Sequence, residues 1–310
     1  MKSEVPDYME SKASKSKKRK SSTRRQWIFR LMAIIFPPTT GWLYGKLESN
    51  WIELTTKSLP FKGVKQGNKI KLLHLSDFHL SKFVSLQEIE AALHAGFSEA
   101  PDACFITGDF ITAQPREEEM NKFSLLLRKY ASRTPTFACL GNHDGGNWAK
   151  SNGGFSNNNQ IRRLLAKSRV KLLHNEGVRM KIRGVPIKII GVGDLWSKDC
   201  RPKVCMNHES QREPDEGIVL MCHNPDAKEI LQTFYWNLML SGHTHGGQFV
   251  IPFTKLAPFA PVSDHSMTEG LHHWGKNKFV HVTSGVGNLY GLRINCRPEI
   301  SLVELLPEKN

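Results

Sequence analysis

The chain lacks several features that define simple classes of protein. Its six cysteines include no Cys-x-x-Cys pair, which argues against a zinc ribbon or a thioredoxin-type centre. The apolar run at residues 31–36 is far shorter than the roughly 20 residues of a membrane-spanning helix, and no internal repeat is visible. What remains is a globular composition, with 39% hydrophobic and 23% charged residues over 310 positions, enough for one large domain or two modest ones.

The cysteines fall into groups with different expected roles. Cys104, Cys139 and Cys222 lie in predicted strands, where a free cysteine is typically a small buried hydrophobic residue. Cys200 and Cys205 share a predicted loop and have the spacing to pair in an oxidising compartment. That spacing alone does not determine the compartment.

Positive charge is concentrated at the N-terminus. Residues 1–30 contain ten Lys or Arg and three Asp or Glu, so this segment carries +7 of the formal net charge of +14. The short apolar run follows, two prolines end it, and tryptophans flank it. Basic residues beside a short apolar run and aromatic residues are typical of an interfacial anchor. We therefore expect residues 12–51 to bind an anionic membrane surface, and we expect no nucleic-acid partner.

Two other interpretations of this segment stay open. Residues 23–29 resemble a twin-arginine export signal, although Arg30 interrupts the apolar region and no small-x-small cleavage site is obvious. A basic run is also often a solvated tail. The anchor interpretation places the protein peripherally on the cytoplasmic face of the inner membrane, whereas the export signal predicts an exported, membrane-associated protein.

Apolar runs after residue 69 indicate alternating strands and helices. A helix is expected after Ser85, which forms a capping box with Glu88, and a second over residues 117–130. Continuous apolar strands separated by helices are the signature of a sheet covered by helices. The strands are expected at residues 70–75, 104–106 and 136–140.

The second half of the chain is predicted to be richer in strands. Residues 145–159 are rich in Gly and Asn and are expected to form a loop, and residues 161–167 a short helix. The shorter strands that follow predict a second sheet packed on the first. They are expected at residues 170–174, 178–183, 186–192, 217–222, 237–241, 247–251, 279–284 and 299–305.

Polar motifs follow five of these predicted strands. They are Asp77-Phe78-His79, Gly108-Asp109, Gly141-Asn142-His143-Asp144, Cys222-His223-Asn224-Pro225 and Gly242-His243-Thr244-His245. If the strand ends meet at one edge, their Asp, Asn and His side chains lie together. That mixture is the ligand set of a two-metal hydrolytic centre, and its nitrogen and oxygen donors suit Mn, Fe or Zn better than a pure Mg site.

Such a centre suits phosphoester chemistry because the phosphorus is surrounded by negatively charged oxygens. Two divalent cations neutralise that charge and lower the pKa of water. Asp109 is the natural bridging carboxylate, and Asp77 and His79 point the same way from one strand end. Asn142 adds an oxygen ligand without adding negative charge. His74 lies inside a strand and is expected to be a packed residue instead of a ligand.

In this order, the five motifs resemble the calcineurin-like metallophosphoesterase family over residues 70–305. The resemblance implies an α/β fold, a four-layer αββα sandwich of mixed sheets with a dinuclear metal site at the carboxyl ends of the strands. Residues 1–60 would form a basic tail and membrane-proximal anchor segment, and residues 61–310 the catalytic domain. Many members carry a second carboxylate shortly after the Gly-Asp motif, and this chain does not.

The resemblance also implies roles for the motif residues. His143 would lie beside the scissile phosphate as a proton donor or transition-state stabiliser, with Asp144 fixing its ring. One ion would be bound by Asp77, His79, Asp109 and His245, and the other by Asp109, Asn142, His223 and His243. Mn²⁺ is the expected metal, with Fe, Zn and Mg as alternatives.

A narrower resemblance concerns the substrate. Residues 240–248 and 296–300 resemble a membrane-associated bacterial subgroup that includes chlamydial-type UDP-2,3-diacylglucosamine pyrophosphatases of lipid A biosynthesis. This implies hydrolysis of a lipid-linked nucleotide at the membrane surface, giving UMP and 2,3-diacylglucosamine 1-phosphate. The alternatives are an exported phosphoesterase of broad specificity and a metal-stabilised scaffold without activity.

Apolar and basic residues near the last motif are further candidates. Residues 249–259 hold five large apolar residues, and their prolines forbid a regular helix. They either fill the core under a loop or form an apolar wall for acyl chains or a membrane contact. Trp148 and Phe155 would extend the same wall. The candidate phosphate contacts are Arg162, Arg163 and Arg293.

Overall fold

The computed structural model describes residues 39–208 and 216–308 of the chain. The basic run, the short apolar run and the motif that resembles an export signal all precede residue 39, outside the described part. Among the described residues, no helix combines the length and the apolar character that crossing a bilayer requires.

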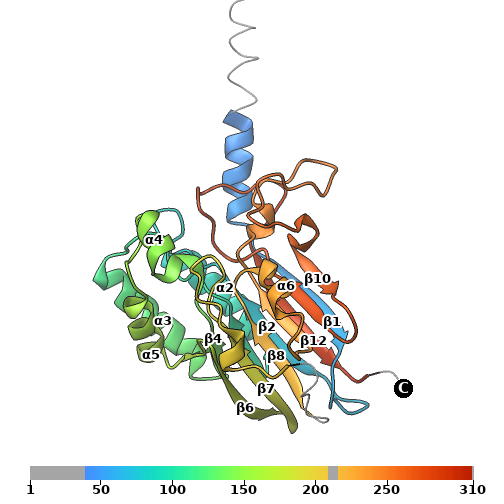
Figure 1. The fold of residues 1–310 in the computed structure, drawn as a ribbon. Helices are drawn as coiled ribbons and strands as arrows, with labels where there is room; N and C mark the ends of the chain where they lie inside the picture. The colour runs from blue at the N-terminus through green and yellow to red at the C-terminus, as the bar shows by residue number, and fades with distance from the viewer. Residues whose placement is uncertain (1–38, 209–215, 309–310) are drawn as a thin grey trace, which may run out of the picture. The chain divides into compact units, whose positions relative to one another are not determined.

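The chain divides into two units, residues 1–42 and residues 43–310. The backbone is helical at residues 39–42 in the first unit and at residues 43–49 in the second. The second unit contains both sheets and all five polar motifs (Figure 1).

Two six-stranded mixed sheets form the centre of the second unit. The first has the order β1 (Glu53–Pro60), β12 (Glu299–Leu306), β2 (Ile70–Leu75), β3 (Ala103–Ile106), β4 (Thr136–Ala138), β5 (Lys171–Leu172). The second has the order β10 (Gly270–His273), β11 (Phe279–Val282), β9 (Leu238–Ser241), β8 (Gly217–Met221), β7 (Val185–Gly191), β6 (Glu176–Ile182). Strands β2 to β5 run parallel, as do β7, β8, β9 and β11. Parallel neighbours bring their carboxyl ends to one edge of each sheet.

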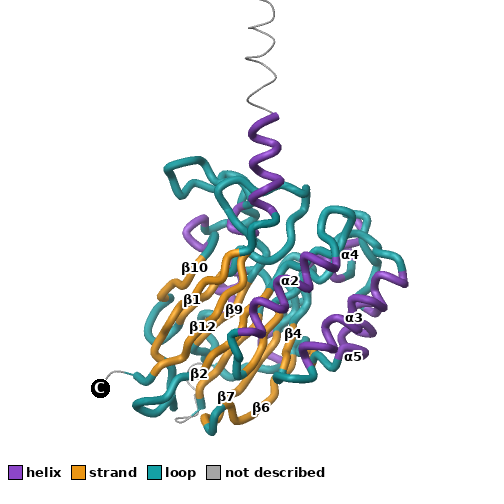
Figure 2. The backbone as a smooth tube through the Cα atoms, turned by 180° about the vertical axis from the view of Figure 1, so that it is seen from behind, coloured by secondary structure: helices purple, strands orange, loops and turns teal. Residues whose placement is uncertain are grey.

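Helices cover the outer faces of the sheets. The longer ones are α2 (Leu86–Ser98), α3 (Glu117–Ala131) and α5 (Asn159–Ser168), which Figure 2 shows along one side of the strands. The shorter helices α4 (Asn147–Ser151) and α6 (Lys228–Leu231) lie in loops. The capping box predicted for α2 is present, since the Glu88 amide donates to the Ser85 hydroxyl at 3.3 Å and the Glu88 carboxylate accepts from the Ser85 amide at 2.6 Å.

Three apolar cores separate four layers. In β2, Leu73 packs with Ile89 and Leu93 of α2, whereas Leu72 packs with residues of the other sheet. The third core lies on the other face of the second sheet, where it includes Leu231 of α6. Because neighbouring residues of a strand face opposite sides, a strand with a core on each side is apolar throughout. The predicted αββα sandwich of mixed sheets is therefore confirmed.

Several parts of the sheets differ from the prediction. Strand β10 was not predicted, and the strands expected at residues 170–174 and 299–305 of the second sheet are β5 and β12 of the first. The strand expected at residues 247–251 is absent, because Gly246, Gly247 and Gln248 adopt left-handed backbone angles that no strand accommodates. Strand β1 was missed, because its Thr, Lys and Ser residues carry little apolar signal. It lies in the segment predicted to be membrane-proximal, yet it pairs in parallel with β12.

A buried histidine pair joins the two sheets. The Nδ1 atoms of His74 on β2 and His281 on β11 lie 2.9 Å apart, and both side chains are fully buried. The Nε2 atom of His74 lies 2.9 Å from the Thr107 hydroxyl, so His74 is a packed strand residue, as predicted. Burial lowers the pKa of His281 to about 4 and also lowers that of His74.

This pair predicts acid sensitivity. Below pH ~6.5 the unfolded chain protonates its histidines, while folded His281 stays neutral down to its pKa of about 4. Between pH ~6.5 and pH ~4 the unfolded state therefore binds more protons than the folded state, so the free energy of unfolding decreases as the pH is lowered. Urea titrations measure the free energy of unfolding at pH 7 and at pH 5. The decrease between the two pH values should be about 2 kcal/mol larger in the wild type than in His281→Gln.

The matched control is His94→Gln, on the exposed face of α2, which should keep the wild-type pH dependence. Equal losses in the wild type and in His281→Gln would show that another group causes the acid sensitivity.

Candidate metal centre

Each polar motif emerges where a parallel strand ends. Motifs from β2, β3 and β4 approach from the first sheet, and motifs from β8 and β9 from the second. The structure brings their side chains into one buried cluster. Three groups of Asp and His place ligand atoms within 4.8 Å of one another: Asp77, His79 and His245; His79, Asp109 and His143; and Asp77, Asp109 and His223.

One side of the cluster centres on Asp77. Its Oδ1 atom lies 3.5 Å from the Nε2 atom of His245 and 3.7 Å from that of His79. The two Nε2 atoms are 3.1 Å apart. All three side chains are buried, so their atoms converge on one point away from bulk water.

The other side centres on Asp109. Its Oδ2 atom lies 3.4 Å from the Nε2 atom of His79 and 3.2 Å from that of His223. The His223 Nε2 atom is in turn 3.3 Å from the Nδ1 atom of His243. Asp109 thus lies between the two sets of imidazoles, where a bridging carboxylate would have to be.

Asn142 and His143 border the same space. Both line a cavity of 310 Å³ that also contains Asp109, His243 and His245. The Oδ1 atom of Asn142 is buried, and no described residue donates a hydrogen bond to it. An unpaired buried carbonyl oxygen is costly unless something binds it, so this atom fits a metal ligand.

The backbone at these motifs is unusual. Five of the seven proposed ligands have left-handed φ angles, which non-glycine residues rarely adopt. They are Asp77 (54°), His79 (48°), Asp109 (55°), His243 (70°) and His245 (53°). Space is equally restricted, because a Cβ atom at Gly242 would lie 2.2 Å from the Oδ2 atom of Asp77. These sharp turns bring ligands that are two residues apart, such as Asp77 and His79, into the same cluster.

In three of these imidazoles, the ring nitrogen that points away from the cluster is hydrogen-bonded to an oxygen atom of the surrounding protein. The His223 Nδ1 atom donates to the Thr107 carbonyl at 2.6 Å, and the His243 Nε2 atom donates to the Pro261 carbonyl at 3.1 Å. The His79 Nδ1 atom shares a 2.6 Å hydrogen bond with the Thr112 hydroxyl. Metal-binding histidines are typically oriented in this way. The opposite ring nitrogens face the cluster, where they would bind the cations.

The electrostatics also suit cations. Burial alone would raise the pKa of Asp77 and Asp109, but neighbouring imidazoles hold both well below their usual range. Burial lowers the pKa of His243 to about 3 and takes that of His245 well below its ordinary value. The hydrogen bonds and charges of Asp109 and Asp77 act in the opposite direction on the other two imidazoles: they outweigh burial, raise the pKa of His79 to about 9 and raise that of His223 well above its ordinary value. The centre therefore holds two ionised carboxylates whose negative charge attracts protons, and would equally attract metal cations. The donor set fits two divalent cations, which would be held by oxygen and nitrogen together.

Asp144 has a different role from the one expected. Its fully buried carboxylate accepts hydrogen bonds from the backbone amides of Asp109, Phe110 and Gly141, each at 2.8 Å. It ties the loop after β3 to the loop after β4 and makes no hydrogen bond to the His143 ring. Burial and the charge of Asp109 raise the pKa of Asp144 to about 7.

Aromatic rings, and not the Asp144 carboxylate, pack against the His143 ring, and an aromatic ring also packs against His243. The His143 ring packs edge-on against Trp148 at 4.6 Å and against His79 at 4.8 Å between centroids. Trp196 packs edge-on against His243 at 4.3 Å. Trp148 was predicted as part of an apolar wall, but nothing in the sequence pointed to Trp196, because it follows β7 in an irregular loop.

The candidate phosphate contacts do not reach the centre. Arg293 is fully buried and donates to backbone carbonyls, including those of His245 at 3.1 Å and Ser284 at 2.7 Å. It holds the turn that carries His245 and is not a phosphate clamp. Arg162 and Arg163 lie on the exposed face of α5, and the Arg162 Nε atom donates to the Asn158 Oδ1 atom at 2.9 Å.

A fold of two mixed sheets with an Asp and His cluster at their ends defines a metallophosphoesterase. Residues 70–247 match the family described as calcineurin-like phosphoesterase. The chain belongs to this family, and it is a metal-dependent phosphoester hydrolase.

Two relatives are informative. Phosphodiesterase YaeI of Escherichia coli is 36% identical over 259 residues, which cover 84% of this chain and 90% of the relative. UDP-2,3-diacylglucosamine pyrophosphatase LpxG of Chlamydia muridarum is 26% identical over 326 aligned positions, which cover 90% of this chain and 97% of the relative. The expected resemblance to the family and to the chlamydial type is therefore confirmed.

The comparisons also correct the predicted location. The sequence placed the protein peripherally on the cytoplasmic face of the inner membrane. The Escherichia coli relative, at 36% identity, is named as a phosphodiesterase, and its name places it at no membrane. The predicted membrane location is therefore wrong.

A first prediction concerns Asn142. Its Oδ1 atom is the only amide oxygen among the proposed ligands, so Asn142→Ala should bind one Mn²⁺ per chain where the wild type binds two. Elemental analysis of desalted protein measures this ratio. Asn121→Ala, on the exposed surface of α3, is the control and should keep two. Two retained ions in Asn142→Ala would show that Asn142 is not a ligand.

A second prediction concerns Thr112, which holds His79 through one hydrogen bond. Thr112→Val keeps the side-chain shape but removes the hydroxyl, so Mn²⁺ affinity should fall roughly 10- to 100-fold. Calorimetric titration of metal-free protein measures the affinity. Thr254→Val removes an exposed hydroxyl in another loop and should bind Mn²⁺ as the wild type does. Unchanged affinity in Thr112→Val would mean that this hydrogen bond does not orient a ligand.

Proposed function

We propose that this protein hydrolyses a phosphodiester or diphosphate bond at a centre of two divalent cations, Mn²⁺ foremost. The position of Asp109 carries the proposal, because its carboxylate lies within 3.4 Å of imidazoles on both sides. The ligands would be Asp77, His79, Asp109, Asn142, His223, His243 and His245. The cations supply charge neutralisation at the phosphate oxygens and activation of water.

The remaining residues position and stabilise the substrate. His143 borders the cavity, its backbone amide donates to Asp109 at 2.8 Å, and Trp148 holds its ring. From there the imidazole would donate a hydrogen bond or a proton to an oxygen of the scissile phosphate. Asp144 would act indirectly, by fixing the loops that carry Asp109 and Asn142.

The charge of the cavity favours a diester over a monoester. Among the described residues that line it, none is Lys or Arg. A monoester carries more negative charge than a diester and usually needs a basic side chain in addition to the metals. This argument agrees with the phosphodiesterase activity named for the Escherichia coli relative.

A particular substrate is suggested by the chlamydial relative, which is named as a UDP-2,3-diacylglucosamine pyrophosphatase. Hydrolysis of the same lipid-linked nucleotide here would give UMP and 2,3-diacylglucosamine 1-phosphate, a step of lipid A biosynthesis. Its two acyl chains would suit the apolar residues beside the centre. A phosphodiesterase of broader specificity is the second candidate, favoured by the higher identity to the Escherichia coli protein.

One experiment tests these proposals together. Purified protein is assayed with Mn²⁺ for UMP release from UDP-2,3-diacylglucosamine and for cleavage of bis(p-nitrophenyl) phosphate. His143→Ala should lower kcat roughly 10²- to 10⁴-fold while retaining two Mn²⁺ per chain, since His143 is proposed as a catalytic residue and not as a ligand.

The outcomes separate the candidates. Release of UMP that needs Mn²⁺ and His143 supports the lipid-linked substrate. Cleavage of the aryl diester alone keeps the phosphodiesterase and rejects that substrate. Loss of Mn²⁺ in His143→Ala would make His143 a ligand, and a wild type that binds Mn²⁺ but cleaves neither compound would overturn the proposed function.

A further inference from the structure

An apolar groove opens directly from the metal cavity. It has a volume of 480 Å³, and its walls include Phe249, Phe259 and Gln248. Four residues line both the groove and the metal cavity: His245, Pro261, Leu289 and Tyr290. A ligand whose phosphate lies at the metal centre therefore has this groove as a neighbouring subsite.

The walls of the groove are uncharged, which favours an uncharged part of a ligand. None of the described residues that line it is Asp, Glu, Lys or Arg. Phe249 and Phe259 pack edge-on at 6.3 Å between centroids, yet 74% of the Phe259 surface and 65% of the Tyr290 surface remain exposed. Large aromatic side chains left exposed beside a reaction centre are typical of a ligand-binding wall.

One polar atom distinguishes the groove from a purely apolar one. The Oε1 atom of Gln248 accepts from the Leu289 amide at 3.3 Å, which sets the orientation of the side-chain amide. The Nε2 atom is buried, and no described residue accepts a hydrogen bond from it. An unpaired buried donor costs free energy that an acceptor oxygen would recover. An ester carbonyl beside a hydrocarbon chain is such an acceptor.

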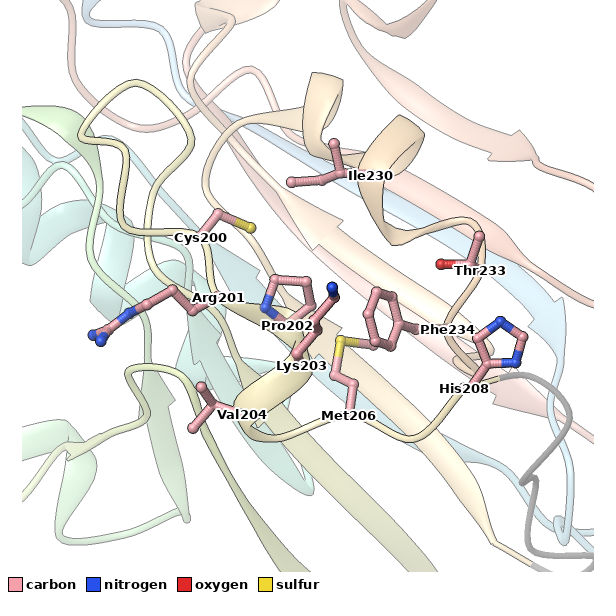
Figure 3. Close-up of a pocket in the computed structure, with 10 residues that line it drawn as sticks. All are labelled: Cys200, Arg201, Pro202, Lys203, Val204, Met206, His208, Ile230, Thr233 and Phe234. Atoms are coloured by element: carbon pink, nitrogen blue, oxygen red, sulfur yellow. The ribbon is translucent and has the colours of Figure 1, made fainter.

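A larger pocket elsewhere in the described part of the chain shares no lining residue with the metal cavity. It measures 780 Å³ and is lined by residues such as Pro202, Met206 and Phe234 (Figure 3). None of its lining residues belongs to the metal cluster. Cys200 lies at its edge and, like Cys205, is a free thiol. Of these two pockets in the described part of the chain, the groove is the one that shares lining residues with the metal cavity.

We propose that the groove binds an acyl chain of the substrate, esterified a few bonds from the scissile phosphorus. The chain would lie along Phe249, Phe259 and Leu289, and the ester carbonyl would accept from Gln248. Tyr290, at the junction, would separate the chain from the metal centre. The inference rests on the proposed phosphodiesterase function and names the class of substrate that this function selects.

The test uses a series of p-nitrophenyl 2-acyloxyethyl phosphates with acetyl, butanoyl, hexanoyl and octanoyl chains, assayed with Mn²⁺ below their critical micelle concentrations. Each buried methylene is expected to raise kcat/KM by up to about fourfold, until the chain outgrows the groove. Ether-linked analogues of the same length should react more slowly, because they lack the carbonyl.

Phe259→Ser and Tyr290→Ser remove walls of the groove and should flatten the dependence of kcat/KM on chain length. Both side chains are largely exposed, so both variants should fold, and Mn²⁺ content reports whether the centre is intact. The matched control is Phe253→Ser, in the same loop, because Phe253 is fully exposed and does not line the groove. It should keep the wild-type dependence.

The possible results test the acyl subsite and the phosphodiesterase function separately. Hydrolysis of the acetyl compound without any gain for longer chains would overturn the acyl subsite and leave the phosphodiesterase standing. A gain that persists in Phe259→Ser and Tyr290→Ser would place the chain elsewhere and also overturn it. Equal rates for ester and ether analogues would overturn the role of Gln248. No hydrolysis of any compound would contradict the proposed function itself.

Discussion

Two ionised carboxylates, Asp77 and Asp109, are fully buried in this protein, and the rest of the site depends on compensating their charge. An unpaired carboxylate in such surroundings would cost many kcal/mol or become protonated. Here imidazoles surround both groups, and backbone amides add to this, since the His243 amide donates to Asp77 at 3.0 Å and the His143 amide to Asp109 at 2.8 Å. The same contacts hold the left-handed turns in place, so the interactions that compensate the charge also offset the cost of the strained backbone.

The two sheets act as rigid supports for these turns. Asp144 joins two loops of the first sheet through three backbone hydrogen bonds. His74 and His281 connect the first sheet to the second, and Arg293 holds the turn that carries His245. Each of these groups is buried and none faces the cavity. Together these contacts tie the chain segments that carry the site to one another.

Chemistry and selectivity come from different parts of the structure. The polar cluster is deep and built from strand ends, which suits a reaction common to a large family. The surrounding walls come from the connections between strands, where Trp148 lies on the short helix α4 and Trp196, Pro261, Leu289 and Tyr290 lie in irregular loops. Loops tolerate change better than strands do. Substrate choice is therefore expected to reside in these walls, whereas the hydrolytic chemistry resides in the strand ends.

The sequence by itself determined the strands with continuous apolar runs, the capped helix α2 and the order of the five motifs, because these depend on neighbouring residues. It did not reveal β1 or β10, whose residues are mostly polar, and it assigned β5 and β12 to the second sheet instead of the first. It also wrongly predicted a strand at residues 247–251, where three successive left-handed residues intervene. Only the tertiary structure decided which groups support the motifs. His223 bonds a carbonyl 116 residues away in the chain, and the Asp144 carboxylate spans 34 residues to reach the Phe110 amide. Such contacts leave no local pattern, because they arise only when two sheets bring distant strand ends to one edge.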